Sequence, residues 1–215
     1  MSLSFPPLYP ILDADVAARA GWTAEALAEA YLRGGARILQ VRAKGAGSRD
    51  LLALCDAIVR LARRYDAEVV VNDRADVAFL AAAAGVHVGQ EDLAPGDVRR
   101  AFPALRLVGR STHTPTQVAA AVREPVSYVA VGPVFGTATK DTGYDAVGLD
   151  LVQEAARAAA QAGDPHLPVV AIGGITLERA ATVLAGGANS VAVISDLLAT
   201  GDPESRVREY LERIG

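Results

Sequence analysis

The sequence predicts an α/β fold, a single (βα)8 TIM barrel that comprises residues 1–215 as one domain. Short runs of apolar, mostly β-branched residues alternate with segments whose apolar residues recur at three- and four-residue spacing. The alternation yields eight strand–helix pairs, with no linker, internal sequence repeat or low-complexity tract between them. Eight such pairs in a chain of 215 residues favour a closed barrel over an open sheet.

The expected strands are short apolar runs, several of which end in polar residues. In chain order they comprise residues 8–12, 36–42, 68–71, 86–88, 106–109, 128–131, 168–172 and 190–194. Thr23 can cap the first helix, which the glycine pair Gly34-Gly35 ends, and Thr114-Pro115 supplies a cap and a first-turn proline to a later helix. One further helix is expected to begin at residue 48. The others are expected to comprise residues 75–84, 95–102, 149–162, 176–185 and 203–213.

Composition narrows the class of protein. Hydrophobic residues make up 51% of the chain, which is enough for a large core and excludes a disordered chain. The formal net charge of −4 argues against a broad basic surface, so we expect no nucleic-acid partner. The single Cys55 precludes an intramolecular disulfide. No apolar run is long enough to span a membrane and no secretory signal is evident, so we expect a cytoplasmic protein without a membrane partner.

Two successive strands end in carboxylates. Asn72 and Asp73 follow the third strand, and Gln90 and Asp92 follow the fourth. Because the carboxyl ends of barrel strands face the catalytic mouth, the two aspartates are expected to converge on a cation. Mg²⁺ prefers such oxygen ligands and commonly pairs one or two carboxylates with substrate phosphates. The alternative for either aspartate alone is a helix cap, but the pair favours a metal–phosphate site.

The second strand ends in cations. By the alternation of strand side chains, Gln40, Arg42 and Lys44 point in one direction. Two adjacent cations suit a polyanion such as pyrophosphate, and the inward-facing Gln40 favours this interpretation over a solvated edge. His87 lies in a buried strand and is interpreted as a hydrogen-bonded core histidine. A single histidine without His or Cys partners does not indicate a zinc site.

Hydroxyl groups follow the fifth and sixth strands. Ser111 lies in the sequence Gly109-Arg-Ser-Thr-His, whose hydroxyls can donate to phosphate oxygens. Thr137, Thr139 and Lys140 lie in the glycine-containing loop 136–146, which we interpret as a mobile lid. The alternative, an ordinary flexible surface loop, predicts no requirement for Lys140.

The seventh and eighth strands end in groups suited to a phosphate. Gly173 and Gly174 follow the seventh strand, and Ser195 follows the eighth. Glycines let backbone amides approach a ligand, and the loops after these two strands form the usual phosphate site of such barrels. We therefore expect two anion sites at one mouth, one lined by backbone and the other cationic and assisted by metal.

Six motifs that contain these residues occur in order over nearly the whole chain: Gln40-Val-Arg-x-Lys44, Asn72-Asp-Arg74, His87-x-Gly-Gln-x-Asp92, Ser111-Thr-His113, Gly132-Pro-x-Phe-x-Thr-x-Thr-Lys140 and Ala171-Ile-Gly-Gly-Ile175. Together they resemble the motifs of the thiamine phosphate synthase family. The resemblance implies a (βα)8 barrel that couples 4-amino-5-hydroxymethyl-2-methylpyrimidine pyrophosphate to a thiazole phosphate and releases pyrophosphate.

The resemblance also implies roles for individual residues. Mg²⁺ would be held against the leaving group by Asp73 and Asp92. Pyrophosphate would be bound by Arg42, Lys44, Asn72 and Lys140. The pyrimidine would be held by Gln40 and Ser111. The thiazole phosphate would be held by Thr137, Thr139, the amides of Gly173 and Gly174, and Ser195. The expected catalytic groups are Arg42, Lys44, Ser111 and Lys140.

No obvious nucleophile or general base is present, and a dissociative displacement needs neither, because the electron-rich aminopyrimidine supports a methylene cation. The main alternative is the related thiazole tautomerase, which does not need the paired aspartates and typically has a histidine where this chain has Pro133. Asp73, Asp92, Lys44 and Pro133 favour the synthase.

Two more distant alternatives are a non-catalytic barrel that binds a phosphorylated ligand and a phosphate-substrate isomerase, which would need an acid–base pair. The segment 141–147 is longer than in the commonest synthase pattern, which bears on lid closure. The sequence leaves open the oligomeric state, with a homo-oligomer among the options, the presence of a carboxylate on the thiazole, and the choice between Mg²⁺ and Mn²⁺.

Overall fold

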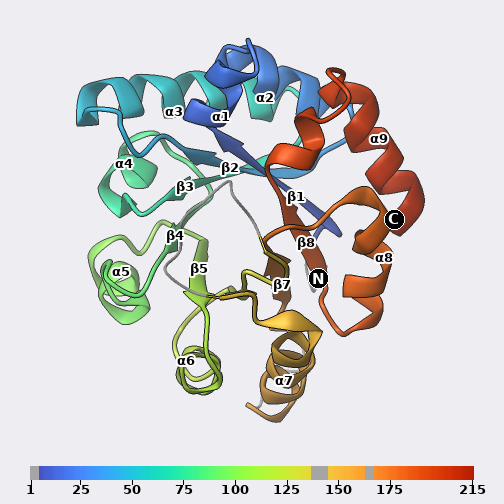
Figure 1. Ribbon diagram of the computed structural model, residues 1–215. Helices are drawn as coiled ribbons and strands as arrows, with labels where there is room; N and C mark the ends of the chain where they lie inside the picture. The colour runs from blue at the N-terminus through green and yellow to red at the C-terminus, as the bar shows by residue number, and fades with distance from the viewer. Residues whose placement is uncertain (1–4, 137–144, 163–166) are drawn as a thin grey trace.

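The computed structural model describes residues 5–136, 145–162 and 167–215. Eight parallel strands pair in chain order and close into a barrel through β1 and β8, while the helices form an outer ring (Figure 1). The strands are β1 (Leu8–Asp13), β2 (Ile38–Arg42), β3 (Glu68–Asn72), β4 (Gly85–Val88), β5 (Leu107–Thr112), β6 (Tyr128–Val131), β7 (Val169–Ile172) and β8 (Ser190–Val193). The (βα)8 barrel expected from the sequence is confirmed.

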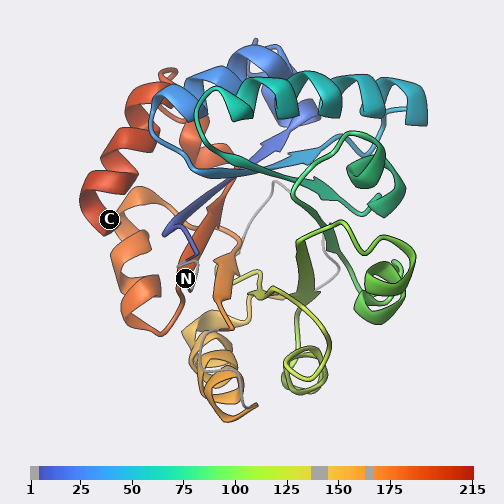
Figure 2. The same ribbon diagram turned by 180° about the vertical axis from the view of Figure 1, so that it is seen from behind.

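The helical elements of the outer ring follow the strands in order. They are α1 (Ala14–Arg19), α2 (Ala24–Arg33), α3 (Ser48–Arg63), α4 (Ala75–Leu80), α5 (Pro95–Ala101), α6 (Pro115–Ala121), α7 (Gly148–Gln161), α8 (Leu177–Ala185), the 3₁₀ helix η1 (Ser195–Leu198) and α9 (Pro203–Ile214). The last helix, α9, packs against both α2 and α8 and so completes the ring, as the reverse view also shows (Figure 2). Within the described ranges, no helix has the length and apolar character required to cross a membrane.

The strands are apolar on both faces because they separate two cores. The larger core lies between the strands and the helices. The smaller core fills the barrel and consists of inward-facing strand residues: Tyr9, Ile11, Ile38, Val70, Tyr128, Ala130, Val170 and Ala192. Packed side chains therefore close the barrel beneath its mouth, and a ligand is expected to bind at the carboxyl ends of the strands.

Two short elements were not expected from the sequence, and both begin at a strand end. Asp13, expected to close the first strand, also caps α1, since its Oδ1 accepts from the amides of Asp15 and Val16 at 3.1 and 3.0 Å. The element η1 begins at Ser195, directly after the eighth strand. Thr23 and Thr114 cap α2 and α6 as expected, each accepting an amide hydrogen at 3.2 Å.

Two boundaries differ from expectation by more than two residues. The helix expected over 75–84 ends at Leu80, because the chain turns through Ala82 with φ of 49° before it enters β4. The strand expected over 106–109 instead comprises Leu107–Thr112, since Ser111 and Thr112 pair with Ala130 and Val131 of β6. Ser111 is thus held by a strand rather than by a loop, which fixes its position at the mouth of the barrel.

Candidate active site at the mouth of the barrel

A pocket opens at the carboxyl ends of the strands. Seven of the expected site residues line it: Gln40, Arg42, Asn72, Ser111, Gly173, Gly174 and Ser195. These residues come from β2, β3, β5 and the loops after β7 and β8. The closure of the barrel thus brings together side chains that are up to 155 positions apart in the chain (195 − 40).

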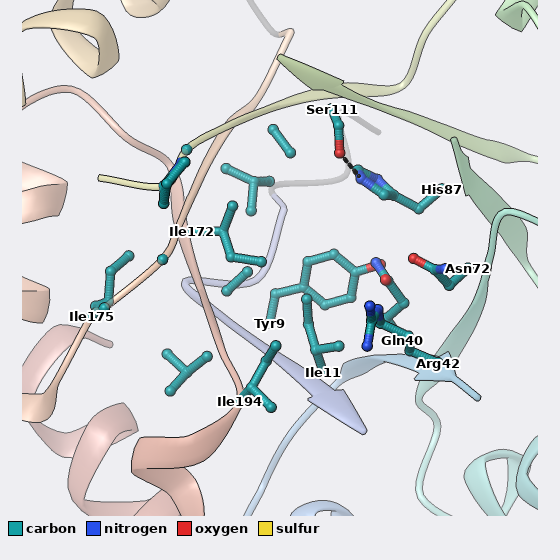
Figure 3. A pocket seen from close by; sticks show the side chains of 18 of the residues that line it. Tyr9, Ile11, Gln40, Arg42, Asn72, His87, Ser111, Ile172, Ile175 and Ile194 are labelled. Carbon is teal, nitrogen blue, oxygen red and sulfur yellow. Dashed lines mark hydrogen bonds between the residues drawn. The ribbon is translucent and has the colours of Figure 1, made fainter. Parts of the chain in front are cut away.

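The pocket has two chemically distinct sides (Figure 3). Gln40, Arg42 and Asn72 lie together on one side, with His87 and Ser111 beside them. Ile172, Ile175 and Ile194 lie across the pocket, and Ile11 contributes to its floor. A pocket with hydrogen-bonding groups on one wall and aliphatic groups on the other suits ligands that have a polar part and an apolar part.

Arg42 is anchored below the pocket. Its Nη1 is ion-paired with the carboxylate of Asp13, which is 3% exposed. Asp13 and Arg42 are opposite one another in the register of β1 and β2. The Nε of Arg42 is buried and has no acceptor among the described residues. Arg42 therefore brings a fixed guanidinium to the polar wall, with donor capacity that Asp13 does not use.

Lys44 and Asp73 lie at the rim, outside the lining of the pocket. The Nζ of Lys44 is 3.7 Å from Oδ2 of Asp73, and both side chains are partly exposed. Asp73 has a φ of 63°, and its amide donates to the carbonyl of His87 at 2.8 Å, which ties the end of β3 to β4. A left-handed backbone is uncommon for non-glycine residues, and Asp is one of the residue types that adopt it most readily.

Asp92 follows β4 at the neighbouring strand end. Its Oδ2 accepts from the amide of Gly89 at 2.7 Å. The N-cap residues of α4 and α5 are Arg74 and Ala94, so the capping role considered for Asp73 and Asp92 is not the one that they have. Asp73 directly follows β3, and Asp92 lies in the segment after β4, the strand that pairs with β3.

The donor set fits Mg²⁺ better than a transition metal. Among the described residues, no group of three or more His, Cys, Asp or Glu side chains is placed to hold a metal. Mg²⁺ does not need such a cage, since it retains waters and is commonly held by one or two carboxylates together with substrate phosphates. Asp73 and Asp92 supply oxygen ligands of that kind, and magnesium binding by this pair stays a prediction.

A buried chain of hydrogen bonds lies below the polar wall. The amide Nε2 of Gln40 donates to the hydroxyl of Tyr9 at 3.1 Å, and the hydroxyls of Tyr9 and Tyr128 are 3.0 Å apart. The Tyr128 hydroxyl is 3.0 Å from Nδ1 of His87, whose Nε2 is 2.8 Å from Oγ of Ser111. His87 is thus buried and hydrogen-bonded, as expected, and it also lines the pocket through its contact with Ser111.

Sequence reasoning did not identify Tyr9 and Tyr128. Both are fully buried, and burial raises the pKa of each hydroxyl well above its ordinary value, so both stay protonated. The available signal was strand alternation, which places Tyr9 and Ile11 on one face of the first strand.

The backbone conformation and close packing after β7 require glycine at positions 173 and 174. Gly173 and Gly174 have φ of 103° and 61°. A Cβ on Gly173 would lie 2.5 Å from Cα of Pro133, and one on Gly174 would lie 2.8 Å from Cβ of Phe135. The carbonyl of Gly173 accepts from the Phe135 amide at 3.0 Å, so this loop is packed tightly against the loop after β6.

Hydrogen bonds to the Asp196 carboxylate fix the segment after β8. Oδ2 of Asp196 accepts from the Leu177 amide at 3.2 Å, from the Tyr210 hydroxyl at 2.7 Å and from Arg206 at 2.8 Å. Asp196 follows Ser195, so the carboxylate joins η1 to α8 and α9. The backbone around the expected phosphate site is thereby fixed relative to two outer helices.

Thr137, Thr139 and Lys140, together with the expected lid, lie outside the described residues. Their assignment to the thiazole phosphate and pyrophosphate stays a prediction.

A family model, curated relatives and a solved structure identify the family of this chain. Residues 8–197 match the TMP-TENI family, described as thiamine monophosphate synthase. A thiamine-phosphate synthase from Thermus thermophilus is 43% identical over 202 residues, which cover 93% of this chain and 94% of the relative. One from Koribacter versatilis is 39% identical and covers 98% and 96%. The structure of a thiamine phosphate pyrophosphorylase from Pyrococcus furiosus superposes with a TM-score of 0.83 at 29% identity, covering 96% and 94%. The chain described here therefore belongs to the thiamine monophosphate synthase family.

Proposed function

We propose that the chain couples 4-amino-5-hydroxymethyl-2-methylpyrimidine pyrophosphate with a thiazole phosphate, by a dissociative displacement assisted by Mg²⁺, to give thiamine phosphate and pyrophosphate. The observation that carries this proposal is the division of the pocket. Its polar wall contains Gln40, Arg42 and Asn72, and its aliphatic wall adjoins the glycine pair in the loop after β7. The two walls match the two substrates in chemical character.

The polar wall would bind the pyrophosphate substrate. Arg42, Lys44 and Asn72 provide hydrogen-bond donors and positive charge at neighbouring strand ends. Asp73 and Asp92 would hold the metal ion. When bound, Mg²⁺ would neutralise negative charge on the departing pyrophosphate. Lys44, at 3.7 Å from Asp73, would place a second positive charge beside the same group.

The opposite wall would bind the thiazole phosphate. The aliphatic side chains of Ile172, Ile175 and Ile194 provide a surface for the thiazole ring and exclude water from the space beside it. The amides of Gly173 and Gly174 lie where barrels of this type bind phosphate, as does Ser195. We propose that Thr137, Thr139 and Lys140 complete the two anion sites.

The proposed reaction requires the protein mainly to neutralise charge and to position the two substrates. The bond between the pyrimidine methylene carbon and the pyrophosphate oxygen breaks, and its electron pair leaves with pyrophosphate. The 4-amino group donates electron density to the methylene cation, and the lone pair of the thiazole nitrogen forms the new carbon–nitrogen bond. Holding the two substrates in this order, without water between them, accounts for the polar and aliphatic walls.

The direct test is product identification after incubation of purified protein with both substrates and Mg²⁺. Thiamine phosphate should form only when both are present. The main alternative, a thiazole tautomerase, would instead interconvert isomers of the thiazole phosphate carboxylate in the absence of any pyrimidine. Isomerisation without coupling would overturn the proposal.

A further inference from the structure

The requirement that each buried donor has an acceptor gives one direction of donation to the buried hydrogen bonds that join Gln40 to Ser111. The Gln40 amide nitrogen donates to the Tyr9 oxygen. If Tyr128 also donated to Tyr9, the hydroxyl hydrogen of Tyr9 would have no acceptor among the described residues, although its side chain is only 1% exposed. A buried donor without an acceptor is costly, so Tyr9 donates to Tyr128.

The same reasoning gives the direction of the remaining hydrogen bonds, from Tyr128 to Ser111 in the pocket. Since the Tyr128 oxygen accepts from Tyr9, its hydroxyl hydrogen is directed to Nδ1 of His87. A neutral His87 with an acceptor Nδ1 carries its proton on Nε2, which then donates to Oγ of Ser111 at 2.8 Å. Burial raises the pKa of both tyrosines, which keeps both hydroxyls available as donors.

We propose that Tyr9 and Tyr128 are positioning residues that lock the Gln40 amide and the His87 tautomer, so that the pocket presents an acceptor at Gln40 and a donor at Ser111. The amide nitrogen of Gln40 is used by Tyr9, which leaves its carbonyl oxygen for a ligand donor. Ser111 accepts from His87 and keeps its own hydroxyl hydrogen for a ligand acceptor. Both groups line the pocket.

This pattern selects a heterocycle with an amino group and an unprotonated ring nitrogen, which are a donor and an acceptor respectively. A 4-oxopyrimidine presents a carbonyl where the 4-aminopyrimidine presents an amino group, and would face the Gln40 oxygen as a second acceptor. Rotating the Gln40 amide to exchange its oxygen and nitrogen would require every hydrogen-bonding proton between Gln40 and Ser111 to move, including that of His87. The inference rests on the proposed function in taking the pyrimidine as the ligand of this wall.

The first test needs no substrate and reads the wild-type protein directly. The chain has three histidines, and the nitrogen-15 shifts of His87 distinguish its tautomers once its signals are assigned with a His87→Gln variant. We expect the unliganded wild-type protein to carry the proton on Nε2 of a neutral His87. A proton on Nδ1 would mean that the hydrogen bonds between Gln40 and Ser111 are donated in the opposite direction. It would overturn the proposal, whatever reaction the protein catalyses.

The second test uses Tyr128→Phe, which removes one hydroxyl and keeps the ring that stacks on His87 at a centroid distance of 5.5 Å. The KM for the pyrimidine pyrophosphate should rise about tenfold, the value of one neutral hydrogen bond, while that for the thiazole phosphate stays within about twofold. Binding of the 4-amino over the 4-oxo pyrimidine should be at least about tenfold tighter in the wild type and should become less selective in the variant.

The matched control is Tyr31→Phe, because the Tyr31 hydroxyl is buried without a hydrogen-bond partner among the described residues and does not line the pocket. Its two KM values and its selectivity should equal those of the wild type. Unchanged KM and selectivity in Tyr128→Phe would overturn the positioning role. An inactive wild type with the expected His87 tautomer would instead overturn the proposed function alone.

Discussion

The guanidinium of Arg42 is ion-paired with the carboxylate of Asp13, the residue opposite it across β1 and β2. The same carboxylate caps α1 through its other oxygen. One buried side chain therefore fixes a cation of the pocket and the start of the first helix. Arg42 is consequently placed before any ligand arrives, which lowers the entropic cost of binding an anion there.

Asp13→Asn should destabilise the protein, because it leaves the Arg42 charge without its partner in a largely buried site. The free energy of unfolding, measured with urea, should fall by about 3 kcal/mol. Asp15→Asn is the matched control in the same turn, since Asp15 is exposed, and should change stability by no more than about 0.5 kcal/mol. Equal stability of the two variants would show that the ion pair contributes nothing.

Asp92→Asn tests the proposed magnesium site, because it would remove one of the two proposed metal ligands and leave the aliphatic wall unchanged. Turnover should fall at least about a hundredfold, and chelation of Mg²⁺ should have the same effect on the wild type. Binding of thiazole phosphate by calorimetry should be nearly unchanged. Asp97→Asn, a change at a half-buried position of α5 whose carboxylate pairs with Arg100 at 2.9 Å, should retain activity. Loss of both turnover and thiazole phosphate binding in Asp92→Asn would contradict two separate sites.

Gly173→Ala should be strained, because the residue has a φ of 103° and its new Cβ would meet Pro133 at 2.5 Å. The free energy of unfolding should fall by about 2 kcal/mol, and the KM for thiazole phosphate should rise more than that for the pyrimidine substrate. Gly96→Ala, in a helix with open space around the added Cβ, should be neutral or slightly stabilising. Equal behaviour of the two variants would refute a special role for the loop after β7.

Cys55 should react with thiol reagents only after unfolding. It is fully buried, and burial, with a smaller contribution from Asp56, raises the pKa of its thiol to about 12. The folded state thus favours the neutral thiol, which stabilises it below about pH 9 and progressively less as the pH rises towards 12. The difference in free energy of unfolding between the wild type and Cys55→Ala should shrink from pH 8 to pH 10. Rapid labelling of the native protein at pH 8 would contradict the burial of this thiol.

The order of elements could be predicted because its signals are local. Apolar runs, helical spacing and caps such as Thr114 all act within a few residues. The short helix α1 was missed because its six residues show no periodicity, although Asp13, Asp15 and Arg19 mark its two ends. The end of α4 at Leu80 was missed because an alanine-rich run does not reveal the turn at Ala82.

The candidate site could be predicted where residues follow strand ends, since every such end faces the same mouth. The partners of these residues depend on register, which only the closed barrel defines. The pairing of Arg42 with Asp13 and the buried contact of Tyr9 with Tyr128 are of this kind. Strand alternation places Tyr128 on one face, but the closure of the barrel decides that this face points inward.

The central claim, a metal-assisted coupling of two substrates in one pocket, is tested most directly by pyrophosphate release. Purified protein is incubated with both substrates and Mg²⁺, and each of the three is omitted in turn. We predict that pyrophosphate appears in equal amount to thiamine phosphate, and that each omission abolishes its release. Release without Mg²⁺, or no release in the complete mixture while thiazole phosphate still binds, would contradict this account.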